Sequence, residues 1–149
     1  MSETATHSVR SDPNCIFCKI AAGAIPCHKI YEDDDVLAFL DIGPIVRGHT
    51  LVIPKRHAVN FLDCPPEIAA SIAQVMPRLC RAVVAATGAK ACHVLVNNGP
   101  EAMQSVMHLH QHILPRLDGD HFHLPWPAEK LDSGEAAEIA AAVRECLKA

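Results

Sequence analysis

Three histidines stand at every second position in the segment HLHQHIL, at residues 108, 110 and 112. Histidine titrates near neutral pH, binds metal ions and can act as a nucleophile, so strict alternation of three indicates chemistry rather than packing. In an extended strand, residues i, i+2 and i+4 point to the same face. We therefore expect His108, His110 and His112 to form a row, while Leu109 and Ile113 point into the core. A metal site remains the alternative to catalysis.

Cys15 and Cys18 form a C-x-x-C pair near the N-terminus. In a chain without export features, this spacing indicates half of a metal site or a redox pair before it indicates a structural disulfide. A thioredoxin-type redox pair needs a preceding strand in a βαβ unit, and none is visible in the sequence. Two free thiols in a short helix remain the simple alternative.

The size and charge of the chain limit its function further. A chain of 149 residues, half of them hydrophobic, suits one globular domain, which we assign to residues 14–149 after a disordered arm at 1–13. The net charge of −4 gives no general attraction to nucleic acid, and no apolar run is long enough to predict a membrane anchor. The N-terminal segment lacks the apolar core of a signal peptide, so we expect a cytoplasmic protein.

The periodicity of the sequence predicts the elements that carry these residues. A short helix is expected to begin at Cys15 and to end at Gly23 in the left-handed conformation. Brief runs rich in β-branched and aromatic residues predict strands, the first two of them paired as a hairpin. These strands are expected over 28–32, 36–41, 49–54, 92–98 and 105–115.

Helical periodicity appears in two further segments. Apolar residues at steps of three and four predict a long amphipathic helix over 65–87, which Pro77 would kink or split. A last helix is expected over 134–147, capped by Ser133. One long helix between runs of strands predicts an α+β fold with a mainly antiparallel sheet of about five strands.

Several blocks of this sequence resemble one known family. HLHQHIL is similar to the signature of the histidine triad (HIT) family, and the blocks CIFCKI, AFLDI, GHTLVIPKRH and LVNNG with QSV follow in the order seen in its bacterial, Hint-like members. The likeness spans about residues 14–116, and the tail with Trp126 also resembles some relatives. It implies a HIT-like fold, nucleotide binding and a nucleotidyl-histidine intermediate, commonly in a homodimer.

The resemblance assigns roles to the histidine row. His110 matches the family nucleophile that attacks the α-phosphorus, and His112 matches the partner that hydrogen-bonds the phosphate oxygens. His49 corresponds to a supporting position beside them. Negative charge on the phosphate must also meet hydrogen-bond donors, and the available side chains near the row are Ser105, Gln104 and Asn97.

The nucleoside would be held by other matching positions. Asp41 falls where the family has a carboxylate that accepts the ribose hydroxyls, a natural bidentate contact. The family's base pocket has apolar walls that grip a purine. Its matching positions here are Phe17, Phe39, Leu40, Ile42 and Leu51. Simple core packing is the alternative for each of these apolar residues, because spacing alone does not separate a pocket wall from the core.

The same resemblance supplies two further ligands for a metal site at the cysteine pair. Relatives with this C-x-x-C motif add the first triad histidine and a histidine after the GHTLVIP strand, which are His108 and His57 here. A closed site with two cysteines and two histidines would hold a structural zinc ion. His49 in place of His57 is an alternative ligand.

One residue departs from the family pattern. Met103 stands where the family loop usually carries glycine, so its β-carbon restricts the backbone there.

From the resemblance we expect hydrolysis of purine nucleoside phosphoramidates or related nucleotidyl conjugates. The alternatives are a dinucleoside polyphosphate hydrolase and a zinc-stabilised nucleotide-binding protein with little turnover.

Overall fold

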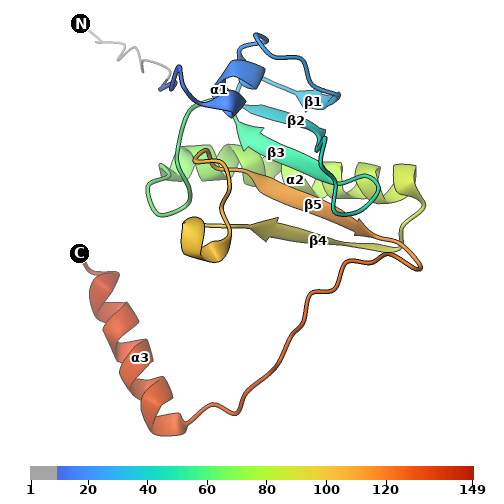
Figure 1. Cartoon of the computed structure of the whole chain (residues 1–149). Coiled ribbons are helices and arrows are strands. Elements are labelled where there is room, and N and C mark those ends of the chain that lie inside the picture. The colour runs from blue at the N-terminus through green and yellow to red at the C-terminus, as the bar shows by residue number, and fades with distance from the viewer. Residues whose placement is uncertain (1–9) are drawn as a thin grey trace, which may run out of the picture.

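The computed structural model describes residues 10–149 and confirms an α+β fold. Five strands form one sheet in the order β1-β2-β3-β5-β4, and every neighbouring pair is antiparallel (Figure 1). The elements are α1 (Ile16–Ala21), β1 (Lys29–Glu32), β2 (Val36–Leu40), β3 (Thr50–Pro54), α2 (Pro66–Thr87), β4 (Ala91–Val96), η1 (Pro100–Ala102), β5 (Gln111–Arg116) and α3 (Ser133–Cys146).

The predicted N-terminal arm lies mostly outside the described residues. Residues 1–9 are not described, so their disorder stays a prediction. From Arg10 onward the chain is bonded to the domain, because the Arg10 carbonyl accepts the backbone N–H of His57 at 2.7 Å.

The two faces of the sheet are covered by different elements, and strand alternation explains how. In β2, Val36 and Ala38 belong to the core beneath α2, while Leu37 and Phe39 belong to a second core with α1. Successive strand residues point to opposite faces, so one short strand can contribute side chains to both cores. The sheet is therefore buried on both sides, and the α1 side is the one that faces the histidine row.

Helix α2 is the long amphipathic helix predicted from the sequence. Ile68, Ile72, Leu79 and Val83 are its buried residues, and they belong to the core that it forms with the sheet. Its length and composition would also suit a membrane-crossing helix, but this buried stripe is typical of a core helix. The helix runs through Pro77 without being split.

Strand β5 begins later than predicted. The sequence predicted a strand from residue 105, whereas β5 starts at Gln111, so only His112 of the three histidines lies in it. In register, the next pairs of β3 and β5 would be Ile53 with His110 and then Pro54 with Leu109. Proline has no N–H to give to a ladder. The Pro54 carbonyl instead accepts from the His108 ring, and the Leu109 N–H donates to the Ala58 carbonyl at 2.7 Å.

The C-terminal helix α3 stands away from the sheet at the end of an extended segment (Figure 1). Its N-cap is Asp132, whose carboxylate accepts the N–H groups of Gly134 and Glu135, so the predicted cap Ser133 was wrong by one residue. Ile139 and Val143 on its apolar face are about half exposed, at 54% and 52%. Within the described part of the chain, α3 therefore buries no apolar stripe of its own.

Candidate functional site

A cavity of about 290 Å³, the main cavity, lies on the α1 side of the sheet. Its position explains why so many predicted residues meet, since α1, β2, β3 and the segment leading into β5 all border it. The predicted residues that line it are Phe17, Phe39, Leu40, Asp41, Ile42, Leu51, Ser105, His110 and His112. One end is apolar and the other carries the histidines, a combination typical of a binding site for a ligand with an apolar and a polar half.

His110 is held in one tautomer. Its Nδ1 lies 2.7 Å from the carbonyl oxygen of His108, and a carbonyl can only accept, so Nδ1 carries the proton and Nε2 is unprotonated in the neutral ring. The ring packs edge-on against Phe17, with centroids 5.2 Å apart. His110 is therefore an oriented imidazole with a free lone pair, which is what a nucleophile requires.

His49 and His112 form a directed hydrogen-bond chain. The Ile45 N–H donates to His49 Nδ1 at 3.2 Å, which leaves the His49 proton on Nε2. That Nε2–H lies 2.8 Å from His112 Nδ1, which must accept, so the His112 proton is on Nε2. His112 Nε2 is buried and has no partner among the described residues. An orphaned buried donor beside a cavity needs an acceptor, and a ligand can supply it.

Burial keeps these rings neutral. Loss of solvation lowers the pKa of His112 to about 4, with the neighbouring His110 and His49 adding to the effect. Burial likewise lowers the pKa of His49, opposed by the Asp41 carboxylate. At pH 7 both therefore act as neutral hydrogen-bonding groups rather than as cations.

Asp41, His49 and His112 also lie close enough to suggest a metal site, with one ligand atom of each within 4.8 Å of the others. The hydrogen bonds argue against it. A metal-bound histidine normally donates its other N–H to an acceptor, but the far nitrogen of His49 already receives the Ile45 N–H. The trio is therefore a hydrogen-bonding unit.

Asp41 lies at the rim of the main cavity, immediately after β2. One carboxylate oxygen accepts the Gly43 N–H at 2.8 Å, and the other is 3.6 Å from His49 Nε2. These contacts orient the carboxylate while its side chain stays 23% exposed. An oriented, accessible carboxylate can accept hydrogen bonds from a pair of hydroxyl groups.

Gln104 and Asn97 were predicted as phosphate donors, and both side chains have hydrogen-bond partners within the protein. Neither lines the main cavity. The Gln104 amide is buried and fully used, since its oxygen accepts from Asn60 and Gly99, and its nitrogen donates to the Val59 and Val106 carbonyls. Gln104 therefore fixes the loop that presents Ser105, and Asn97 bonds the Met103 carbonyl at 3.3 Å.

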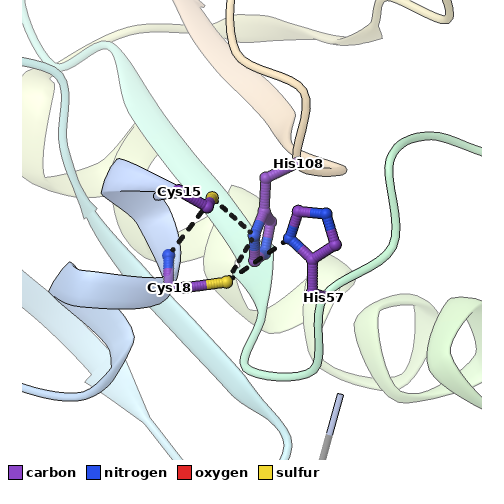
Figure 2. A group of neighbouring side chains, drawn as sticks. All are labelled: Cys15, Cys18, His57 and His108. Atoms are coloured by element: carbon purple, nitrogen blue, oxygen red, sulfur yellow. Dashed lines mark hydrogen bonds between the residues drawn. The ribbon is translucent and has the colours of Figure 1, made fainter. Parts of the chain in front are cut away.

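The cysteine pair and two histidines form a separate cluster (Figure 2). Cys15 precedes α1, Cys18 lies in it, His57 follows β3, and His108 precedes β5. His108 Nδ1 lies 3.4 Å from Cys15 Sγ and 3.5 Å from Cys18 Sγ, and His57 Nδ1 lies 3.4 Å from Cys18 Sγ. The cluster brings together the four predicted ligands and excludes His49, the alternative ligand.

The donor set fits a tetrahedral zinc ion. Zn–S bonds of about 2.3 Å and Zn–N bonds of about 2.0 Å at tetrahedral angles place S and N about 3.5 Å apart, close to the separations seen. The second nitrogen of His108 donates to the Pro54 carbonyl at 2.8 Å, which frees Nδ1 for a metal. Backbone N–H groups of Cys18 and Asp12 point at the two sulfurs, as expected around thiolates.

Some cavity residues escaped the sequence analysis. The apolar end is completed by Ile16 and Ile20 of α1, by the loop at Ile25 and Pro26, and by Val106. The apolar residues of α1 were a usable signal, because a short helix on a sheet must bury one side. The loop carried no such signal, since its place depends on the turn after Gly23.

Comparison with known proteins agrees with this arrangement. The HIT domain model matches residues 22–119. The chain is 48% identical over 114 residues to Protein hit of Bacillus subtilis, covering 76% of this chain and 79% of that one. It is 40% identical over 141 residues to adenylylsulfatase HINT3 of Arabidopsis thaliana (90% and 70% covered). It is also 39% identical over 136 residues to adenosine 5′-monophosphoramidase hnt1 of Schizosaccharomyces pombe (91% and 99% covered).

Solved structures show the same fold. SMU.412c from Streptococcus mutans superposes with a TM-score of 0.89 at 40% identity, covering 92% of this chain and 87% of that one. A Zn-bound histidine triad family protein from Mycobacterium smegmatis gives a TM-score of 0.69 at 39% identity, covering 91% and 96%. With the family model matched across most of its length and the histidine row in place, the chain belongs to the HIT domain family.

Proposed function

We propose that this protein hydrolyses purine nucleoside phosphoramidates or related nucleotidyl conjugates through a covalent intermediate on His110. The observation that carries the proposal is the hydrogen bond from His110 Nδ1 to the His108 carbonyl, which leaves Nε2 unprotonated at the main cavity. The names of two relatives support the substrate class, since one is an adenosine 5′-monophosphoramidase and another an adenylylsulfatase.

The first step forms one bond and breaks one. His110 Nε2 attacks the α-phosphorus, the bond from phosphorus to the leaving nitrogen breaks, and the departing amine takes a proton from solvent. Water then attacks the nucleotidyl-histidine, which releases the mononucleotide and restores the ring. In both steps the Nδ1–H stays on the His108 carbonyl, which stabilises positive charge on the ring.

The other residues of the site hold the nucleotide. The orphaned His112 Nε2–H and the Ser105 hydroxyl can donate to phosphate oxygens, where negative charge builds up in the transition state. Asp41 can accept the ribose hydroxyls, and Phe17, Phe39 and Leu51 enclose the base. His49 acts through His112, because it fixes which nitrogen of that ring carries the proton.

We also propose that Cys15, Cys18, His57 and His108 hold a structural zinc ion. With all four positions taken by protein, zinc would supply folding energy and leave no site for water. Burial raises the pKa of the Cys15 thiol, and a bound cation would reverse this effect. The role of this chain's residues is to fix the segment that carries His110.

The intermediate provides the test. Wild-type protein mixed with adenosine 5′-phosphoramidate and quenched in alkali, which preserves phosphoramidate bonds to histidine, should gain the mass of an adenylyl group. His110→Ala should gain none and should lose at least about 10³-fold in kcat/KM, because the nucleophile is removed. His28→Ala, a change of an exposed histidine in the loop before β1, is the matched control and should behave as wild type.

Other outcomes would redirect the proposal. Equal trapping by wild type and His110→Ala would remove the covalent mechanism. Faster turnover of diadenosine polyphosphates than of the phosphoramidate would favour the polyphosphate hydrolase. Tight binding of AMP with no turnover of either substrate would leave a nucleotide-binding protein.

A further inference from the structure

A second cavity, the side cavity, adjoins the main cavity. Its volume is about 320 Å³, and it shares Ile16, Ser105 and Val106 with the main cavity. The side cavity adds Asp12, Asn14 and Met107 to this common wall. The two spaces therefore meet at Ser105, a residue that the proposed function places at the phosphate.

The side cavity lies at the correct end of the site for a leaving group. A third cavity also touches the main one, but through Ile20, Ile25, Pro26 and Cys27, at the apolar end where the base would lie. A nucleotidyl conjugate has two halves on either side of phosphorus. With the nucleoside in the main cavity, the other half must pass on the Ser105 side.

Asp12 is fixed in the wall of this space. Its backbone N–H donates to Cys18 Sγ at 3.4 Å, and its carbonyl accepts the Cys15 N–H at 3.1 Å. One carboxylate oxygen accepts the Asn14 N–H at 2.8 Å, and the other makes no hydrogen bond within residues 10–149. Asp12 is half-buried, so a ligand cation there would be less screened than on an open surface.

The charged side chains that line the two cavities are negative. The described residues that line the main and side cavities include two carboxylates, Asp12 and Asp41, and no lysine or arginine. A polyphosphate leaving group would bring additional negative charge toward Asp12. An amine with a cationic substituent would find an acceptor there, and its stem would lie on Ile16, Val106 and Met107.

We infer that the side cavity is the leaving-group subsite and that Asp12 is a specificity-determining residue that selects amine leaving groups carrying a second, cationic group. The inference rests on the proposed function and names the leaving group for it. Asp12 takes no part in bond breaking, so its effect falls on the choice between substrates.

Three adenosine 5′-phosphoramidates of equal chain length test this. Their N-alkyl groups end in an ammonium (5-aminopentyl), a methyl (pentyl) or a carboxylate (4-carboxybutyl). For wild type we expect kcat/KM to be about five- to tenfold higher for the ammonium than for the methyl substrate, and lowest for the carboxylate. Asp12→Asn should equalise the first two, and Asp12→Lys should reverse the order.

Controls separate charge from folding. Asp34→Asn removes a carboxylate from the exposed turn between β1 and β2 and should keep the wild-type preference. Zinc content should be equal in all variants, because the Asp12 contacts to the cysteines are made by its backbone. Raising the salt to about 0.5 M should reduce the preference in wild type and in Asp34→Asn, which both keep Asp12.

The inference is overturned if wild type shows no preference for the ammonium, or if Asp12→Asn keeps it. Hydrolysis of the methyl substrate in either case leaves the proposed function intact. Should none of the three be hydrolysed, turnover of the unsubstituted adenosine 5′-phosphoramidate decides the proposed function. The subsite is then judged by calorimetric binding of the same three compounds to wild type and Asp12→Asn, where the same order of affinities is expected and its absence refutes the subsite.

Discussion

Met103 is the only non-glycine residue with a positive φ in residues 10–149, at 67°. An L-residue in this region costs about 1–2 kcal/mol, because its β-carbon crowds the following carbonyl. Met103 is 82% exposed, so packing of its side chain offsets little of this cost. The glycine usual at this position of the family would remove the strain.

We therefore predict that Met103→Gly raises the free energy of unfolding by about 1 kcal/mol, measured by urea denaturation. Met107→Gly is the matched control, since Met107 has no positive φ and should lose stability. A fall in stability for Met103→Gly would show that the side chain makes contacts the structure lacks.

The neutral histidines give a pH dependence at the same scale. Burial lowers the pKa of His112 to about 4 in the folded protein, against about 6.5 for a free histidine. Between these two pH values the unfolded chain binds a proton at this residue and the folded protein does not. The free energy of unfolding should be highest above pH 6.5 and should fall as the pH drops toward 4. His49, whose pKa is also lowered, acts in the same direction.

Urea denaturation at several pH values between 7.5 and 4.5 measures this slope. His112→Asn should show a shallower slope than wild type, because it removes one of the groups responsible. Zinc content followed in the same samples separates metal loss from histidine titration. Equal slopes for the two proteins would contradict the assignment.

The sequence predicted the histidine row and the cysteine pair because their residue types and spacing are local. Both lie within short segments, so the four residues of the cysteine–histidine cluster and most cavity residues could be named. The partners of the Gln104 amide could not be predicted, because they are distant in sequence, Asn60 by 44 residues and Val59 by 45. No local pattern distinguishes an amide used by the scaffold from one free to bind a ligand.

At the scale of elements, the cysteine–histidine cluster joins α1, the loop after β3 and the segment before β5. None of these segments is long enough to be stable alone. A tetrahedral ion at the cluster would connect three parts of the chain that the sheet ladder does not pair.

We predict that His57→Ala reduces zinc from about one ion per chain to less than a tenth of that, measured by mass spectrometry of protein purified without added metal. Its Tm should fall, and adenylyl trapping should fall with it. His49→Ala should keep its zinc, because His49 lies outside the cluster. Full zinc occupancy in His57→Ala would remove His57 from the ligands.

Element boundaries depended on contacts that periodicity does not report. The predicted strand at 105–115 was too long because the ladder with β3 ends at Val52 and Gln111, and the Leu109 N–H beyond it donates to the Ala58 carbonyl instead. The prediction that Leu109 and the three histidines lie on opposite faces was nevertheless correct. His108, His110 and His112 pack toward Phe17 or one another, while Leu109 and Ile113 are buried beneath α2.

At the scale of the whole molecule, the apolar side chains of α3 are exposed while those of the core are buried. Ile139 is 54% exposed, whereas Ile72 of α2 is fully buried. We predict that Ile139→Lys changes the free energy of unfolding by less than about 0.5 kcal/mol, while Ile72→Ala costs about 2–5 kcal/mol. Urea denaturation measures both.

The same comparison tests the homodimer expected from the family resemblance. A loss of more than about 1 kcal/mol in Ile139→Lys, together with a fall in mass by light scattering, would mean that a second copy covers α3 in solution. A small loss with unchanged mass would place any dimer contact elsewhere on the chain.

His108 serves two neighbours at once, since its ring faces the cysteines while its carbonyl holds the imidazole of His110. Any displacement of the His108 backbone, such as the departure of an ion bound at its ring, would therefore also shift the neighbouring imidazole at the mouth of the main cavity.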